Sequence, residues 1–314
     1  MENMESSQSV IQPANQLDAR STNVTITTSA LDGSTTPSPV SSSKSVAIEI
    51  DDHYDVSHPK HGIALVINQM NFSNMSPRDG SDIDCNSISS VLKTIGFDVR
   101  VIEDLKRKKL LAMLKTIASE DHSQNNCLVV VVLTHGKEKN RLYANDKSYK
   151  VSKLWEPFVG DACPSLVGKP KLFFIQACRG KKLDIGSRVK RMIKEPIQVP
   201  INYVIPAMAD LLVMYSTCDG YYAWRNTDKG SWFIQSLSNE LGVNAYRLEL
   251  LHILTAVSRR VAYQYQSNVP RSLTLDAKKQ MPCIVSMLTK LLYFPTQKPQ
   301  PDCSLLTRTD NSGE

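Results

Sequence analysis

The sequence lacks a long apolar run, a cysteine framework and a strong net charge, and each absence excludes a class of protein. No apolar stretch approaches the roughly 18–20 residues needed to cross a bilayer, and the N-terminal MENMESSQSVIQPANQ has neither the basic flank nor the apolar core of a secretory signal. The seven cysteines include no C-x-x-C pair, which argues against disulfides and a structural zinc site. We therefore expect a cytoplasmic chain with reduced thiols and no metal or other cofactor.

The net charge of +6 is modest, and much of it is local. Residues 181–194, KKLDIGSRVKRMIK, carry six basic residues against a single acidic one, Asp184. No aromatic residue is interleaved with this run as a stacking platform for bases, so we interpret it as a solvated loop. We expect neither nucleic acid nor a membrane among the partners.

Between two polar ends, the hydrophobic pattern alternates between strands and helices. Residues 1–45 and 296–314 have too few apolar residues to bury and are predicted to be disordered. Strands are predicted at 62–68, 99–103, 127–133, 171–175, 211–217 and 283–294, and helices at 87–97, 105–118, 231–241 and 248–265. Uninterrupted apolar runs such as CLVVVVL are typical of strands covered on both faces. The alternation predicts an α/β fold with a mostly parallel sheet and helices on both sides.

Two of the predicted strands end in reactive side chains. CLVVVVL runs into THG at 134–136, and KLFFI runs into QACRG at 176–180. Because ligands bind beyond the carboxyl ends of parallel strands, neighbouring strands would place His135 and Cys178 in one crevice. A thiolate there could attack a carbonyl carbon while the imidazole moves protons. The flanking glycines would let the amides of Gly136 and Cys178 face a developing oxyanion.

Each of these residues also has an ordinary structural explanation. A lone Cys that ends an apolar strand is more often a small core residue, and a lone His is usually structural. We keep that interpretation for the six other Cys and the five other His. Cys178 differs because QACRG, with a His about 50 residues upstream, matches a known local signature of caspases. Here His135 lies 43 residues before Cys178.

Residues 60 to 294 resemble a caspase catalytic domain through five motifs in the same order. They are MSPRDGSDID (75–84), LTHGKEK (133–139), IQACRG (175–180), YSTCDGYYAWRNTDKGSWFIQSL (215–237) and AKKQMPCIVSMLTKLLYF (277–294). The resemblance implies a three-layer sandwich in which helices flank a six-stranded, mostly parallel sheet. It also implies a cysteine endopeptidase that cleaves proteins after Asp, made as a zymogen and usually a homodimer of protomers cut into two subunits.

The resemblance divides the chain into five parts and names the partners. The parts are a Ser/Thr-rich prosegment (1–45), the large-subunit part (46–184), a basic intersubunit linker (185–205), the small-subunit part (206–295) and a flexible tail (296–314). Besides protein substrates, the implied partners are an upstream activating protease and caspase inhibitors. The N-terminal segment is too short and too polar for an adaptor-recruitment domain of about 90 residues, which favours an executioner of apoptosis.

The catalytic roles carry over position by position. Cys178 would be the nucleophile and His135 the general acid and base, while the carbonyl of Ser76 orients His135. Arg78, Gln176 and Arg225 would hold the substrate's Asp, because guanidinium groups bind carboxylates bidentately and remain charged. The remaining substrate contacts are assigned to Tyr222, Ala223, Trp224, Asn226 and Trp232. Of these, Ala223 would pair with the substrate as an added strand, as would Arg225, and the aromatic residues would form apolar walls.

Processing and outer specificity are less well matched. The candidate cleavage site between the two subunits is Asp184. The N-terminal segment has three further candidates, Asp32, Asp51 and Asp55, which the sequence does not rank. Asp184 follows Lys181-Lys182-Leu183, where effector caspases have an acidic residue at the first of these positions, so it is a poor site for self-cleavage. Residues 267–279 lack the aromatic residues of effector caspases and have Leu275 instead, which leaves the outer substrate preference open.

Of two alternatives to an active Asp-directed peptidase, one stays open. The first is a catalytically dead homologue that acts as a scaffold or dimer partner, although such relatives typically lose the Cys, the His or a pocket Arg. The second is a thiol hydrolase of another specificity, which would require the Asp pocket to be absent; its residues Arg78, Gln176 and Arg225 are present, so this alternative is rejected.

Overall fold

The computed structural model describes residues 51–184, 206–272 and 274–295. In this part, a six-stranded sheet has the strand order β11-β8-β7-β3-β1-β2. The strands are β1 (Lys60–Asn68), β2 (Asp98–Glu103), β3 (Asn125–Leu133), β7 (Lys171–Gln176), β8 (Leu211–Tyr215) and β11 (Cys283–Ser286). All neighbours are parallel except β11, which runs antiparallel to β8. The predicted six-stranded, mostly parallel α/β sheet is confirmed. The predicted prosegment 1–45, the linker 185–205, the tail 296–314 and Asp32 lie outside the described residues.

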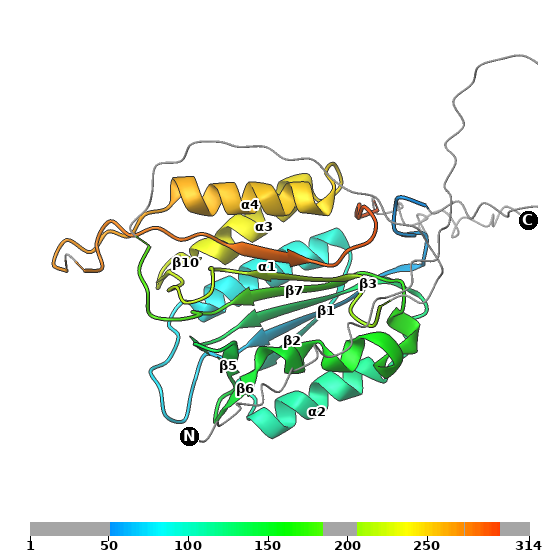
Figure 1. Ribbon diagram of the computed structural model, residues 1–314, viewed down its shortest axis with the longest axis horizontal. Coiled ribbons are helices and arrows are strands. Elements are labelled where there is room, and N and C mark those ends of the chain that lie inside the picture. The colour runs from blue at the N-terminus through cyan, green and yellow to red at the C-terminus, as the bar shows by residue number, and fades with distance from the viewer. Residues whose placement is uncertain (1–50, 185–205, 273, 296–314) are drawn as a thin grey trace, which may run out of the picture. The chain divides into compact units, whose positions relative to one another are not determined.

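Helices cover both faces of this sheet (Figure 1). On one face lie α1 (Ser81–Ile95), α3 (Trp232–Asn244) and α4 (Leu250–Gln264), and on the other α2 (Arg107–Ala118) with 3-10 turns at Val151–Leu154, Glu156–Phe158, Gly160–Ala162 and Pro164–Leu166. Alternate residues of β3 enter opposite cores: Val129 packs with the first group and Val130 with the second. Burial on both faces explains why these strands read as unbroken apolar runs. No helix among the described residues is both long and apolar enough to cross a membrane.

Two small antiparallel sheets branch from the main one. The first consists of β4 (Gly136–Lys137), β5 (Arg141–Tyr143) and β6 (Ser148–Lys150), and it follows β3 directly. The second is the hairpin of β9 (Arg225–Asn226) and β10 (Gly230–Ser231), which leads into α3. Ser231 begins α3 by accepting a hydrogen bond from the amide of Ile234 at 3.2 Å, a conventional N-cap.

The predicted closing strand 283–294 is wrong beyond Ser286. Only Cys283–Ser286 pairs with β8, and the chain then turns so that Leu291 forms a bridge with His53. Leu292 and Phe294 are buried in the core that α1, α3 and α4 share. The apolar residues after Ser286 are therefore buried without forming a strand. In so short a run, sequence periodicity cannot distinguish a buried irregular segment from a paired strand. The first predicted helix, 87–97, is also displaced, since α1 runs from Ser81 to Ile95. The prediction missed the beginning of α1 because its first turn is largely polar.

Candidate active site

The loops that follow β3 and β7 lie side by side. The two strands are neighbours, Leu133 is paired with Gln176, and the amide of Thr134 donates to the carbonyl of Gln176 at 3.1 Å. One step further, a Cβ added to Gly136 would lie 1.8 Å from the carbonyl oxygen of Cys178, so only glycine fits there. His135 and Cys178 line one cleft of about 180 Å³ at this end of the sheet. The structure thus brings together the two reactive side chains that the sequence singled out.

The imidazole of His135 is held from two sides. Its Nε2 lies 3.0 Å from the carbonyl oxygen of Ser76, and its ring packs on Phe72 with the centroids 4.7 Å apart. Burial lowers the pKa of His135, opposed by the hydrogen bond to Ser76 and reinforced by the charges of Arg78 and Arg225. A lowered pKa keeps the ring neutral near pH 7, which is the form that can accept a proton.

The thiol of Cys178 is partly buried beneath the loop that carries Ala223. The Ala223 amide donates to Sγ at 3.5 Å, and Sγ lies 3.7 Å from the Ala223 carbonyl oxygen. Burial raises the pKa of Cys178, while the Ala223 amide and then the charges of Arg78 and Arg225 act in the opposite direction. The free protein therefore favours a thiol beside a neutral imidazole. Attack would require proton transfer between them.

Two arginines form a cationic pocket beside the thiol. Arg78 is 1% exposed, and its guanidinium contacts Ser81 Oγ and the carbonyl of Gln69. Arg225 donates from Nε to the carbonyl of Asp79 at 2.7 Å. Among the described residues, neither guanidinium has a carboxylate within 4.0 Å. Burial, followed by the charge of Arg225, lowers the pKa of Arg78 to about 9.

A buried cation without a contacting carboxylate is costly, and a bound anion would relieve that cost. The charge of Asp84 partly opposes the lowering of the Arg78 pKa, although its carboxylate is not in contact with Arg78. Both arginines line the same cleft as Cys178, and Gln176 lines it too, with its side-chain amide oxygen buried and unpartnered. The three residues predicted to hold the substrate's carboxylate are therefore together.

The predicted aromatic walls form a ladder of rings. Tyr222 contacts Trp224 at 5.3 Å between centroids, Trp224 stacks on Trp232 at 5.6 Å, and Trp232 stacks on Tyr265 at 5.4 Å. Tyr222 is 42% exposed and Trp232 only 8%. Tyr222, Ala223 and Trp224 line the cleft at Cys178, whereas Trp232 does not. The ladder therefore runs from the cleft to the buried Trp232 and on to the half-buried Tyr265.

Asn226 also lies outside the cleft lining. Its side-chain oxygen accepts hydrogen bonds from the amides of Asp228 and Lys229, at 2.8 and 2.9 Å. This Asx turn closes the β9–β10 hairpin and fixes the Asn226 side chain.

Gln280 is a site residue that sequence reasoning missed. It is 1% exposed, accepts from the Trp224 amide at 2.6 Å and donates to the Ser216 carbonyl at 2.8 Å. Gln280 therefore connects the loop that carries Trp224 to the end of β8. Its position inside the matched motif 277–294 was the available signal, but the residue type alone did not indicate a buried role.

The chain after Cys178 is clamped between two loops. A Cβ at Gly180 would lie 2.2 Å from the carbonyl oxygen of Gly220, and the amide of Lys182 donates to that same carbonyl at 3.0 Å. The carbonyl of Asp184 accepts from the amide of Lys279 at 3.0 Å. The backbone at Asp184, the predicted linker site, is thus paired up to the last described residue before the linker.

The two described N-terminal candidates differ in their surroundings. Asp51 and Asp55 are both exposed. Between them, the carbonyl of Asp52 accepts from the Leu291 amide at 2.7 Å, and the Tyr54 amide donates to the Leu291 carbonyl at 3.0 Å. A cut after Asp55 would remove both contacts, whereas a cut after Asp51 would preserve them.

An α/β sheet can hold a thiol, an imidazole and a pair of arginines at the carboxyl ends of its strands. When no described carboxylate contacts those arginines, the arrangement is typical of a thiol hydrolase for an anionic substrate group. The profile of the family "Caspase domain" matches residues 61–293, and the chain belongs to the caspase family. It is therefore a cysteine-type endopeptidase of the class that cleaves proteins after Asp.

Individual relatives agree with this assignment. The chain is 42% identical to caspase drICE of Drosophila melanogaster over 79% of this chain and 74% of the relative. It is 44% identical to caspase-3 of Mus musculus over 80% of this chain and 91% of the relative. The crystal structure of caspase-1 from Spodoptera frugiperda matches with a TM-score of 0.75 and 41% identity, over 81% of this chain and 98% of that one.

Proposed function

We propose that the chain is an executioner of apoptosis, made as a zymogen, in which Cys178 and His135 cleave the bond after a substrate Asp. The observation that carries the proposal is Arg78, a buried guanidinium without a carboxylate partner among the described residues, in the cleft that holds the thiol. The carboxylate of a substrate Asp supplies the missing anion and is held by Arg78, Gln176 and Arg225. The relatives named caspase-3 and caspase drICE support the executioner role.

Binding of the substrate carboxylate positions the scissile carbonyl over Cys178. His135, held at Ser76, takes the thiol proton, and Sγ attacks the carbonyl carbon to form the tetrahedral intermediate. The amides of Gly136 and Cys178 stabilise the oxyanion. His135 then donates the proton to the leaving amine, and water hydrolyses the thioester.

The other roles are extensions of this proposal. The backbone of Ala223 and Arg225 pairs with the substrate, Tyr222, Trp224 and Trp232 form the apolar walls, and Asn226 contacts the outer position. We further propose a cytoplasmic homodimer that an upstream protease activates and caspase inhibitors bind.

The test is a panel of fluorogenic tetrapeptides varied at the first and fourth positions before the cut. Replacing Asp by Asn at the cleavage position leaves the buried Arg78 and the half-buried Arg225 without an anion, so kcat/KM should fall about a thousandfold. Arg225→Ala should weaken cleavage of Asp peptides severely. Comparable kcat/KM for Asp and Asn would contradict the pocket.

The same panel separates an active enzyme from a dead homologue. Cys178→Ala and His135→Ala should abolish turnover without unfolding the protein, because each removes chemistry and little packing. Turnover that survives in Cys178→Ala would exclude it as the nucleophile. Absence of turnover in the wild type after processing would favour the scaffold alternative.

A further inference from the structure

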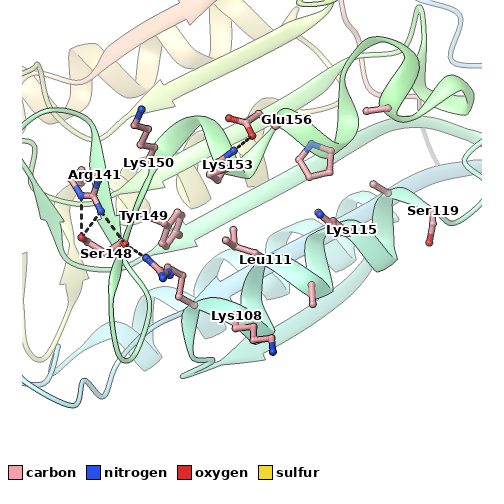
Figure 2. Close-up of a pocket in the computed structure, with 15 residues that line it drawn as sticks. Lys108, Leu111, Lys115, Ser119, Arg141, Ser148, Tyr149, Lys150, Lys153 and Glu156 are labelled. Carbon is pink, nitrogen blue, oxygen red and sulfur yellow. Dashed lines mark hydrogen bonds and ion pairs between the residues drawn. The ribbon is translucent and has the colours of Figure 1, made fainter.

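Figure 2 shows a second cleft. Its volume of about 1020 Å³ is larger than that of the active-site cleft, with which it shares no lining residue. It lies between α2 and the segment that runs from β6 through the 3-10 turns. We call it the basic cleft, because six of its fifteen lining residues are basic and Glu156 is the only acidic one. The basic residues are Arg107, Lys108, Lys115, Arg141, Lys150 and Lys153.

The cleft combines cations with apolar surface. On α2, Lys108, Leu111 and Lys115 follow one another at helical spacing and form one wall (Figure 2). The opposite wall carries Tyr149 and Lys150. Tyr149 is 3% exposed, and its buried hydroxyl has no hydrogen-bond partner among the described residues. A ligand with alternating acidic and apolar groups would match both kinds of surface.

The positive charge of the basic cleft is largely uncompensated. Within the described part of the chain, Lys153 is the one of the six with a carboxylate within 4.0 Å, that of Glu156. Arg141 and Arg107 bond to Ser148, which is neutral. Several like charges around one concave surface attract anions and would repel a basic segment.

The basic cleft begins close to the catalytic loop. Its lining residue Arg141 pairs with Lys137 across the β4–β5 ladder, and Lys137 is the second residue after His135. The amide of Tyr143 on β5 also donates to the carbonyl of His135 at 3.0 Å. A protein segment bound in the basic cleft would therefore lie near the active-site cleft.

We propose that the basic cleft docks an acidic, amphipathic segment of protein substrates, remote from their cleavage site. Carboxylates of the segment pair with the cations, and its apolar side chains cover Leu111 and the wall beside Tyr149. This proposal rests on the proposed function, since it assigns the basic cleft to substrates of the same peptidase. Tethering raises the effective concentration of the scissile segment and lowers KM without changing the chemical step. Nucleic acid is disfavoured because Tyr149 is buried and offers no stacking face.

The binding test uses the Cys178→Ala protein and a fluorescein-labelled dodecapeptide that alternates Glu with Leu, which contains no Asp to cleave. Lys115→Glu/Lys150→Glu reverses two exposed lysines of the basic cleft that have no ion pair within the described residues, so no salt bridge is lost. Lys93→Glu/Lys109→Glu makes the same charge change at exposed lysines outside it. Fluorescence anisotropy should show Kd about tenfold weaker for the first variant and unchanged for the second.

Three results of this binding test would overturn the docking site. They are equal Kd for both double variants, equal binding of a peptide with Gln in place of Glu, and tighter binding of a uridine dodecanucleotide than of the acidic peptide.

The activity test compares an Asp tetrapeptide with the same tetrapeptide joined to the Glu–Leu segment by Gly–Ser linkers of several lengths. In the wild type, the best linked substrate should have a KM about tenfold lower than the short one, and the Lys115→Glu/Lys150→Glu variant should lose this gain. Its kcat/KM on the short tetrapeptide should stay within twofold of the wild type. Equal KM for all substrates would overturn docking alone, whereas failure to cleave any Asp tetrapeptide, with peptide binding intact, would overturn the proposed function alone.

Discussion

Gly136 and Cys178 touch through their backbones, so closely that a Cβ at position 136 would lie 1.8 Å from the Cys178 carbonyl oxygen. The residue after His135 is thus packed against the residue that carries the thiol. Because backbone atoms make this contact, the relative position of imidazole and thiol depends on two rigid strand ends and not on flexible side chains alone.

Gly136→Ala should therefore lose at least about a hundredfold in kcat/KM on an Asp tetrapeptide, because the methyl group forces the two loops apart. The matched control is Gly242→Ala in α3, whose added Cβ would meet Val91 at an ordinary 3.9 Å. It should retain activity and gain some stability from the better helix former. Activity within a few-fold of wild type in Gly136→Ala would show that this contact does not position the site.

Cys178 should react slowly with iodoacetamide at neutral pH in the free protein. Its pKa is raised, chiefly by burial, so the thiolate fraction at pH 7 is smaller than for an ordinary cysteine and grows as the pH rises. Arg225→Ala should raise this pKa further, since the Arg225 charge favours the thiolate. The rate is followed against pH by peptide mapping, with Cys178→Ala as background. An apparent pKa at or below about 8.5 would contradict the expectation.

Asp84→Asn should stabilise the protein at neutral pH. Asp84 accepts from the Ser231 amide at 2.7 Å, but its other oxygen is buried without a partner, and burial raises its pKa from 3.8 to about 6. A raised carboxyl pKa means that the folded state resists ionisation, so wild type loses stability relative to the variant as pH rises from 4 to 6.

That difference should reach about 2–3 kcal/mol above pH 6 and then stay constant. Urea unfolding of both proteins at pH 4, 5, 6 and 7 measures it. A difference that does not change with pH would show that Asp84 titrates normally in the folded protein.

Gln280→Met should raise KM for Asp tetrapeptides about tenfold and lower stability. The substitution keeps the approximate volume but leaves the Trp224 amide and the Ser216 carbonyl without their partner, at about 1–3 kcal/mol for each buried group. Gln264→Met, at an exposed end of α4, is the control and should behave as wild type. A normal KM in Gln280→Met would show that the Trp224 loop is held by other contacts.

Self-cleavage after Asp184 should be slow or absent. Lys181 stands at the fourth position before the cut, where effector caspases have an acidic residue, and a pocket for a carboxylate disfavours a lysine there. The Asp184 carbonyl also already accepts a hydrogen bond from the Lys279 amide. Wild type, Asp184→Ala and Cys178→Ala are expressed, and their fragments are followed by intact mass and N-terminal sequencing. Rapid wild-type cleavage after Asp184, lost in both variants, would prove this prediction wrong.

Trimming after Asp51 should leave the protein more stable than trimming after Asp55, which removes the Tyr54–Leu291 pairing.

The central sheet and the reactive pair could be predicted from the amino-acid sequence. Strands such as β3 are buried on both faces, and that burial leaves an uninterrupted apolar run that can be recognised without a structure. The reactive pair could also be recognised, because the residues that mark it lie next to it in the sequence. Gly136 follows His135 and Gly180 follows Cys178 by two positions, and each glycine is required by a close backbone contact.

Which distant residues share a surface depends on tertiary packing. Arg78 and Arg225 come from different ends of the domain. Their position beside the thiol, without a carboxylate partner among the described residues, follows from packing that no local pattern records. The same is true of Gln280, of the turn after Ser286 and of the basic cleft between α2 and β6. Periodicity reports how deeply a residue is buried, but the identity of its neighbours depends on how separate elements pack.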